Sequence, residues 1–127
     1  MNVRRVALLG FAPKQRLRRK REFDAAFKDG RRISDSFFSL SVRPNELGFA
    51  RLGLAIAART VGNAVARNRV RRTIKESFRL NQRVLPAVDI VVGARNAARA
   101  APNADMRASL ERLWQRVIRQ CAPSSAA

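Results

Sequence analysis

The strongest pattern of hydrophobic and polar positions runs from Asn63 to Leu80, a stretch of 18 residues without Gly or Pro. Wound as a helix at about 100° per residue, its apolar side chains gather on one arc. That arc holds Ala66, Val70, Ile74, Ser77 and Phe78, and the opposite arc holds Asn68, Arg71, Arg72, Lys75 and Arg79. Asn63 is suited to cap the helix, because its side chain can accept a free backbone N–H. The pattern therefore predicts one long helix with a buried face and a basic face.

Three other segments carry strand patterns. Residues 36–43 and 51–57 alternate between apolar side chains and polar or small ones, which indicates half-buried strands. Residues 89–95 are apolar almost throughout, which is typical of a strand that is central in its sheet or covered on both faces. We expect the first two strands to be adjacent and antiparallel. The succession of strand, helix and strand predicts that residues 50–57 and 88–94 run parallel in one sheet.

The two alternating strands would turn a second face of unusual composition away from the core. Phe37, Ser39 and Ser41 lie on it, beside the small side chains of residues 51–57. Such a flat face of small residues suits a flexible strand of nucleic acid. An ordinary solvated face is the alternative, but it usually carries bulkier Lys, Glu and Thr, so we favour the binding face.

Two further helices complete the predicted domain. Residues 20–28 place Phe23 and Phe27 one turn apart, and Gly30 ends this helix. Residues 105–120 repeat apolar side chains at the spacing of a helix that faces a core. The predicted organisation is a flexible basic N-terminal arm over residues 1–16, a single domain over residues 17–120 and a disordered tail over residues 121–127.

Composition adds a strong charge to this picture. The 127 residues include 27 Lys and Arg against nine Asp and Glu, a net charge of +18. Such a surface repels itself unless a polyanion neutralises it, and the planar forks of Arg suit phosphates. A GC-rich genome would also enrich Arg, so the bias by itself has two explanations. No apolar run reaches the ~20 residues needed to cross a bilayer. These features predict a soluble, cytoplasmic protein that binds a polyanion.

The sequence offers no familiar catalytic constellation. It has no His, which removes the common general base near neutral pH and the imidazole metal ligand. Glu22 and Asp24 are the closest pair of acids, yet residues two positions apart do not share a helix face. Cys121 is the single cysteine, so the chain can form neither an internal disulfide nor a thiolate cluster. A protein with its own active site is therefore disfavoured.

The run from Gly62 to Arg72, followed by Ile74, Glu76 and Phe78, resembles the signature of the bacterial ribonuclease P protein component. The segments around it agree with that family. They are Phe23 and Phe27 before Gly30, Arg51 to Leu54 ahead of the signature, and Asp89 to Val92 with Ala94 and Arg95 after it. The resemblance covers residues 17–119.

This resemblance implies an α+β sandwich with the order α-β-β-β-α-β-α: a four-stranded mixed sheet, three helices and a left-handed β-α-β crossover. General rules alone would predict the right hand. It also implies a subunit of the ribonuclease P ribonucleoprotein, which promotes endonucleolytic 5′ maturation of tRNA. In that family the RNA subunit carries the phosphodiester hydrolysis, with Mg²⁺ bound mainly by the RNA. The implied partners are this catalytic RNA and precursor tRNA, without a membrane or an obligatory protein partner.

The resemblance also assigns residues to two surfaces. The set that it implies for binding the catalytic RNA is Arg67, Asn68, Arg69, Arg71, Arg72 and Lys75. The cleft that it implies for the 5′ leader of precursor tRNA is lined by Phe23, Phe27 and Phe37, with Arg51 and Arg59 steering the phosphates. Two departures from the family stand out. Ala58 occupies a position that is often basic, which bears on one leader contact, and the N-terminal arm is longer than expected.

Two other classes of protein share the charge and the basic helix. A structural rRNA-binding protein of ribosomal type would not need the open face around Phe37, Ser39 and Ser41. A DNA-binding regulator would use residues 63–80 as its recognition helix, but strands precede that helix where a helix-turn-helix would place another helix. The ribonuclease P interpretation is therefore preferred.

Overall fold

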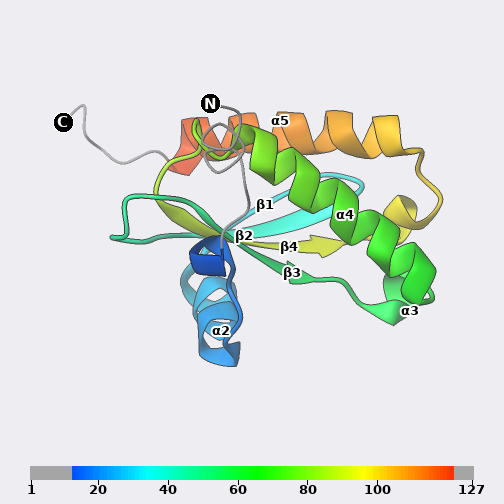
Figure 1. Ribbon diagram of the computed structural model, residues 1–127, viewed down its shortest axis with the longest axis horizontal. Helices are drawn as coiled ribbons and strands as arrows, with labels where there is room; N and C mark the ends of the chain where they lie inside the picture. Colours follow the sequence, from blue (N-terminus) through cyan, green and yellow to red (C-terminus); the bar gives the residue numbers. More distant parts are fainter. Residues whose placement is uncertain (1–12, 122–127) are drawn as a thin grey trace, which may run out of the picture.

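The computed structural model describes residues 13–121, which form a four-stranded sheet with helices on both faces (Figure 1). In chain order the elements are η1 (Pro13–Gln15), α2 (Lys20–Asp29), β1 (Arg31–Ser34), β2 (Phe38–Pro44), β3 (Arg51–Ala55), α3 (Ala58–Val61), α4 (Ala64–Asn81), β4 (Val88–Ala94), η2 (Asn96–Arg99) and α5 (Asn103–Cys121). The three predicted helices are present, and their ends differ by at most two residues from those expected. The short helices η1, α3 and η2 are additional to the prediction.

β4 lies inside the sheet, whose strand order is β1-β2-β4-β3. It pairs antiparallel with β2 and parallel with β3. The prediction that residues 36–43 and 51–57 are adjacent is therefore wrong, whereas the parallel pairing of residues 51–57 with 89–95 is confirmed. The physical reason is burial, because the first five residues of β4 are buried and such a strand gains most from a central position. The more polar β3 is left at the edge.

β1 is an edge strand that the sequence pattern does not predict. It has four residues, of which Ile33 alone is fully buried, opposite Leu40 of β2. A single buried side chain gives no repeat from which a period of two can be read. The third strand ahead of α4 was therefore expected from the family resemblance alone.

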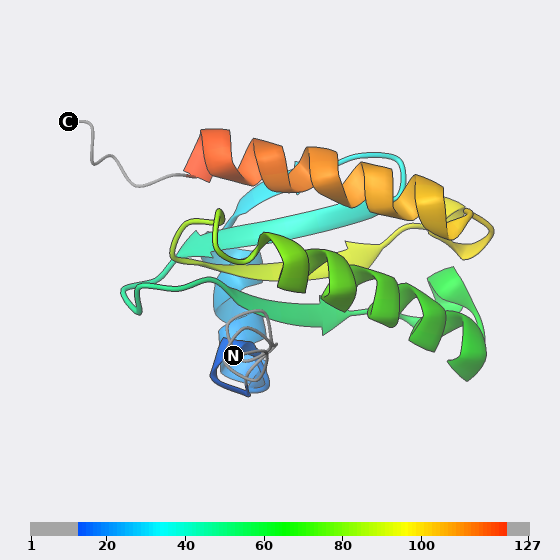
Figure 2. The ribbon, with the colours of Figure 1, turned by 45° about the horizontal axis from the view of Figure 1, so that its top comes forward.

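The connection from β3 to β4 has the uncommon hand (Figure 2). Both strands run to the right in this view, α4 lies on the viewer's side of the sheet, and the chain moves upward from β3 to β4. A right-handed connection would move downward in the same orientation. The crossover is therefore left-handed, as the resemblance implied and against the general rule.

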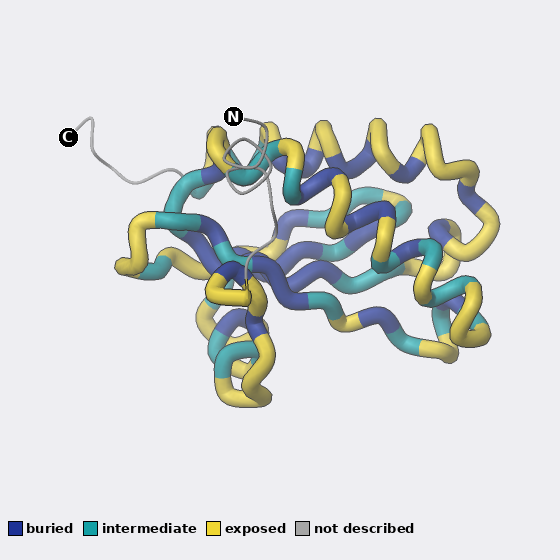
Figure 3. Tube along the Cα trace, viewed as in Figure 1, coloured by how far each residue is buried: buried dark blue, intermediate teal, exposed yellow. Residues whose placement is uncertain are grey.

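α4 and α5 cover one face of the sheet and bury the main core against it, which appears in Figure 3 as buried segments along the strands and the inner sides of both helices. The ring of Trp114 on α5 meets Phe78 on α4 edge to face, with centroids 6.1 Å apart. Its indole N–H donates to Ser77 Oγ at 2.8 Å, so this buried polar group is satisfied. Within residues 13–121, no helix has both the length and the apolar character to cross a bilayer.

α2 stands on the opposite face of the sheet and forms a smaller apolar cluster (Figure 1). Leu17, Ala26 and Val91 are buried in it, with Phe23 half-buried beside them. Ser41, on this side of the sheet, is also buried. The face expected around Phe37, Ser39 and Ser41 is therefore only partly open, because α2 packs against β2 and β4.

Residues 13–16 belong to the domain rather than to a flexible arm. Arg16 forms a parallel bridge with Leu52 on the edge strand β3, and Leu17 N–H donates to Leu52 O at 2.9 Å. Gln15 is buried and bonds to Gln82 after α4. Cys121, expected in the tail, ends α5. Residues 1–12 and 122–127, which make up the rest of the predicted arm and tail, lie outside the described residues.

Candidate nucleic-acid interface

α4 presents a cationic face because its apolar side chains repeat at helical spacing and leave the charged ones outside. Val70, Ile74 and Phe78 are fully buried against the core. The helix begins where expected, since Asn63 Oδ1 accepts the Ala66 N–H at 3.0 Å. Folding of this amphipathic sequence therefore fixes the direction in which its cations point.

The outer side of α4 borders an open groove of about 410 Å³. Its lining residues are Arg16, Asn68, Arg71, Arg72, Lys75, Glu76 and Arg79. Among the described residues, Arg71, Arg72 and Lys75 form no hydrogen bond or ion pair, whereas Arg79 pairs with Glu76. One acid against five cations leaves the groove strongly positive, which suits phosphates. Four of the six residues assigned to the catalytic RNA meet here: Asn68, Arg71, Arg72 and Lys75.

Arg69 lies elsewhere on α4 and binds the protein itself. Its Nη1 donates to Ala101 O at 3.0 Å and to Asn103 Oδ1 at 2.7 Å. Its Nη2 donates to Arg99 O at 3.0 Å and to Ala98 O at 3.4 Å. The guanidinium fork thus holds the loop between β4 and α5 against α4. Its assignment to the RNA stays a prediction from the resemblance.

Arg67 lies on the flank of α4, between the buried and the cationic faces. Its Nε is buried and has no hydrogen-bond partner among the described residues. A buried donor without a partner costs about 1–3 kcal/mol. Arg67 is therefore the one assigned residue whose own geometry calls for an additional acceptor.

The two aromatic side chains of α2 lie one turn apart on the opposite side of the sheet. A β-carbon at Gly53 would lie 2.8 Å from Phe23 Cζ, so the Phe23 ring packs directly on the backbone of β3. Phe27 follows with 48% of its surface exposed. A large aromatic side chain left this exposed is available to a stacking partner.

Phe37 is not brought into the apolar cluster of α2. It precedes β2, meets Phe38 edge to face with centroids 6.4 Å apart, and packs against the main core. Its N–H donates to Asp35 Oδ1 at 2.9 Å. Arg59 is exposed on the short helix α3, beyond the end of β3. The structure therefore places Phe37 and Arg59 away from the apolar cluster that contains Phe23.

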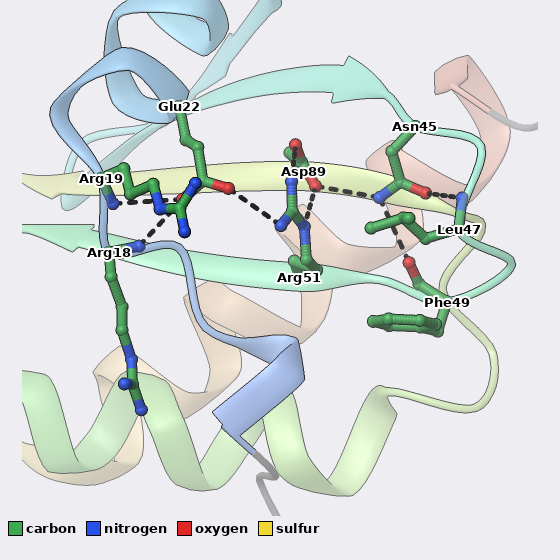
Figure 4. A network of polar contacts seen from close by, with 8 residues as sticks. All are labelled: Arg18, Arg19, Glu22, Asn45, Leu47, Phe49, Arg51 and Asp89. Carbon is green, nitrogen blue, oxygen red and sulfur yellow. Dashed lines mark hydrogen bonds and ion pairs between the residues drawn. The ribbon is translucent and has the colours of Figure 1, made fainter.

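Arg51 lies at the centre of a polar network that joins four segments of the chain (Figure 4). Its Nε and Nη2 each lie 2.8 Å from one oxygen of Asp89, and its Nη1 lies 3.0 Å from Glu22 Oε2. Asn45 Nδ2 donates to the same Asp89 at 2.9 Å and to Phe49 O at 3.2 Å. The network fastens α2 and the loop before β3 to the start of β3 and β4. An arginine expected to steer leader phosphates is thus already neutralised by two carboxylates.

The charges of this network shift the pKa values of two members. Partial burial opposes ionisation of Glu22, but the backbone N–H groups of Arg19 and Arg18 and the charge of Arg51 outweigh it, so the pKa of Glu22 lies below its ordinary value. The hydrogen bond to Asp89 exceeds the effect of burial and raises the pKa of Arg51. Both groups are therefore charged at neutral pH.

Sequence reasoning missed Arg16 as part of the groove. The segment before α2 looks like part of a mobile arm, yet Leu17 anchors it on β3 and Arg16 thereby reaches the groove beside α4. The sequence signal that could have indicated this anchoring was Leu17, an apolar residue within a basic segment. Arg79, a second lining residue, was placed on the basic arc of α4 but not among the assigned residues.

Within residues 13–121, no group of three His, Cys, Asp or Glu side chains could hold a metal ion.

Comparison with known proteins gives consistent results. Residues 11–118 match the protein family described as Ribonuclease P. A relative from Thioalkalivibrio sulfidiphilus, named ribonuclease P protein component, is 43% identical over 113 residues, which cover 89% of this chain and 94% of that protein. A relative of the same name from Methylococcus capsulatus is 41% identical over 116 residues, which cover 91% of each chain.

Solved structures agree with the sequence relatives. The RNase P protein of Staphylococcus aureus aligns with a TM-score of 0.76 and 29% identity, covering 80% of this chain and 93% of that one. The RNase P protein of Thermotoga maritima, in complex with 1-(4-fluorophenyl)-2-thiourea, aligns with a TM-score of 0.74 and 33% identity, covering 80% of this chain and 98% of that one.

Proposed function

The chain belongs to the ribonuclease P protein family, and we propose from this premise that it docks the catalytic RNA on α4 and holds the 5′ leader of precursor tRNA beside α2. Members of the family are subunits of the endoribonuclease ribonuclease P. The relatives described above carry that name, so the ribosomal alternative is not retained. The expected compartment is the cytoplasm.

The groove of α4 carries the proposal for the catalytic RNA. Arg71, Arg72 and Lys75 lie opposite the buried face of the helix and form no ion pair with a described residue. Phosphate oxygens of an RNA would supply the missing charge. An acceptor from the same RNA would also satisfy the buried Nε of Arg67. Asn68 lies between these groups and is suited to a base edge or a 2′-hydroxyl.

The leader is proposed to lie across the uncovered end of the sheet face beside α2. Phe27 offers an exposed ring there. Ser39 and Gly93 are paired in the sheet and only half-buried, and Ala55 of β3 is exposed, so a strand could approach the backbone closely. Arg59 and Arg95 add exposed positive charge beyond the strand ends. Arg51 supports this surface by holding α2, since its own charge is already paired.

The protein's contribution to cleavage would be binding and orientation. Hydrolysis belongs to the RNA subunit in this family, with Mg²⁺ bound mainly by the RNA. Neutralising phosphates with fixed guanidinium groups would lower the concentration of Mg²⁺ that the RNA needs. We therefore expect the protein to extend leader removal to low Mg²⁺.

The test is cleavage of a precursor tRNA by the family's catalytic RNA, with and without this protein, at a Mg²⁺ concentration where the RNA alone is nearly inactive. The proposal predicts a strong rise in the cleavage rate on adding protein. A double variant, Arg71→Ala with Arg72→Ala, should need a higher protein concentration for the same rate. Arg107→Ala, an exposed arginine on α5, is the matched control. No stimulation by the unaltered protein would contradict the proposal.

A further inference from the structure

One carboxylate lies among the cations of the groove on α4. Glu76 is the single acid among the residues that line this groove, whereas five of the others are Arg or Lys. Its side chain is 53% exposed, and its Oε1 accepts a hydrogen bond from Nη2 of Arg79. The helix therefore turns a negative group towards the space in which the proposed docking places phosphates.

The position of Glu76 on α4 divides the groove into two parts. Glu76 follows Arg72 by four residues and precedes Arg79 by three, so the three side chains lie on the same side of the helix. Arg71 and Arg72 form no ion pair with a described residue, whereas Arg79 is paired with Glu76. One part of the groove thus attracts phosphates, and in the other part the charges already balance.

A carboxylate distinguishes between chemical groups of an RNA that cations treat alike. Arg and Lys only donate hydrogen bonds, and they attract the phosphates of any RNA. An ionised carboxylate only accepts, so it repels a phosphate and binds an amino group of a base or a 2′-hydroxyl. Repulsion of the wrong partner is a common source of specificity in binding surfaces.

Stability alone does not explain an acid at this position. Exposed ion pairs three residues apart on a helix contribute little to stability, and the Arg79 side chain is itself 31% exposed. We propose that Glu76 determines which RNA the groove accepts. It receives a hydrogen bond from a base amino group or a 2′-hydroxyl of the catalytic RNA, and it repels an RNA that places a phosphate there. This inference rests on the proposed docking of the catalytic RNA on α4.

Binding of two RNAs to the full-length protein at one salt concentration tests the inference. The two are the family's catalytic RNA and a short unrelated RNA duplex. Glu76→Ala removes the charge and the acceptor, so it should bind the duplex about threefold more tightly and the catalytic RNA about tenfold more weakly. Glu76→Gln keeps an acceptor oxygen, so it should also bind the duplex about threefold more tightly but the catalytic RNA within about twofold of the unaltered protein.

Two results would overturn the inference. If Glu76→Ala changes both affinities equally, Glu76 acts only through the net charge, and if it changes neither affinity, Glu76 only holds Arg79. Asp24→Asn is the matched control, because Asp24 is an exposed acid on α2 that pairs with Lys20 at 2.8 Å and lies outside the groove. It alters the net charge by the same amount and should leave the ratio of the two affinities unchanged.

The double variant Arg71→Ala with Arg72→Ala separates this inference from the proposed function. If the double variant binds the catalytic RNA normally, docking on α4 is wrong. If it binds weakly while Glu76→Ala leaves the ratio unchanged, the inference about Glu76 alone is wrong.

Nucleotide-analogue interference identifies the group that Glu76 binds. Catalytic RNA with single 2′-hydroxyl or base amino groups removed at random is selected for binding to the unaltered protein and to Glu76→Ala. The expected result is a position at which removal of the donor weakens binding to the unaltered protein but not to Glu76→Ala. Identical interference patterns for the two proteins would contradict a hydrogen bond from the RNA to Glu76.

Discussion

The arginines at the start of β3 and on the outer side of α4 are the same kind of side chain in opposite surroundings. Arg51 is bound by Asp89 and Glu22, and the Asp89 side chain is only 6% exposed. Arg71 and Arg72 face an open groove and bind no described residue. The chain has nine acids for 27 cations, and two of those acids hold Arg51. The contrast shows that the surroundings of an arginine, rather than the type of side chain, decide whether it holds the fold together or stays available to bind an anion.

Arg69 shows that structural and available arginines occur side by side even within the short signature of α4. It is two residues from Arg67 and Arg71 in the sequence, yet it binds backbone carbonyls of the loop before α5. A run of arginines therefore does not form a uniform RNA-binding stripe. Helical geometry points some of these arginines at the rest of the protein and others into the groove.

The largest expected effect on stability belongs to Arg51→Ala. The substitution leaves the carboxylates of Asp89 and Glu22 partly buried without their cation, and removal of one partner from such a pair costs about 3 kcal/mol. Chemical denaturation of the free protein measures this loss. Arg43→Ala is a matched control, because Arg43 is the β2 residue paired with Asp89 in the register but is exposed. It should change stability by less than about 0.5 kcal/mol. Equal effects of the two would mean that the network does not hold the fold.

A smaller loss of stability is expected from Arg69→Lys. Lysine keeps the charge but cannot reproduce the fork that bonds Ala101, Asn103 and Arg99 together, so about 2 kcal/mol should be lost. Urea denaturation is the measurement, with Arg72→Lys as the control on the same helix. If Arg69→Lys leaves stability unchanged and weakens RNA binding tenfold, Arg69 belongs with the groove instead.

The smallest effect concerns the dependence of stability on pH. Because the pKa of Glu22 is lower in the folded protein, its contribution is present above the unfolded value of about 4.3 and is lost as the pH falls through the folded value. Glu22→Gln should therefore be less stable than the unaltered protein at pH 7, by at most about 1 kcal/mol for a partly exposed pair. Thermal melting of both proteins from pH 7 to pH 3 should show this gap closing below pH 4. A gap that stays constant would mean that the charge of Glu22 is unimportant.

The helices of this fold could be predicted from the sequence because each repeats its apolar side chains over several turns. α4 and α5 bury Phe78 and Trp114 as their patterns indicate. The continuous apolar run of β4 indicated a central strand beside β3, but the pairing of β2 with β4 could not be predicted, because a strand pattern does not identify every neighbour. β1 was hidden because it buries only Ile33.

For a related reason, the part of the candidate site on α4 could be predicted, whereas the contacts between different elements could not. Helical periodicity places Asn68, Arg71, Arg72 and Lys75 on one face, and the structure brings them to one groove. Nothing in the sequence indicates that Arg51 meets Asp89, 38 residues away, because that contact depends on the register of two strands. Local patterns thus show to which face of a helix or strand a side chain belongs. The partners that the side chain meets on other elements can be identified only from the three-dimensional fold.

The salt dependence of binding to the catalytic RNA tests most directly whether available and paired arginines differ. Each phosphate contact contributes about 0.7–0.9 to the slope of log affinity against log salt. The account predicts that Arg71→Ala with Arg72→Ala lowers this slope by about 1.4–1.8 units, while Arg51→Ala, measured where it is folded, leaves the slope unchanged. An equal fall of the slope in both variants, or no fall in the double variant, would contradict the account.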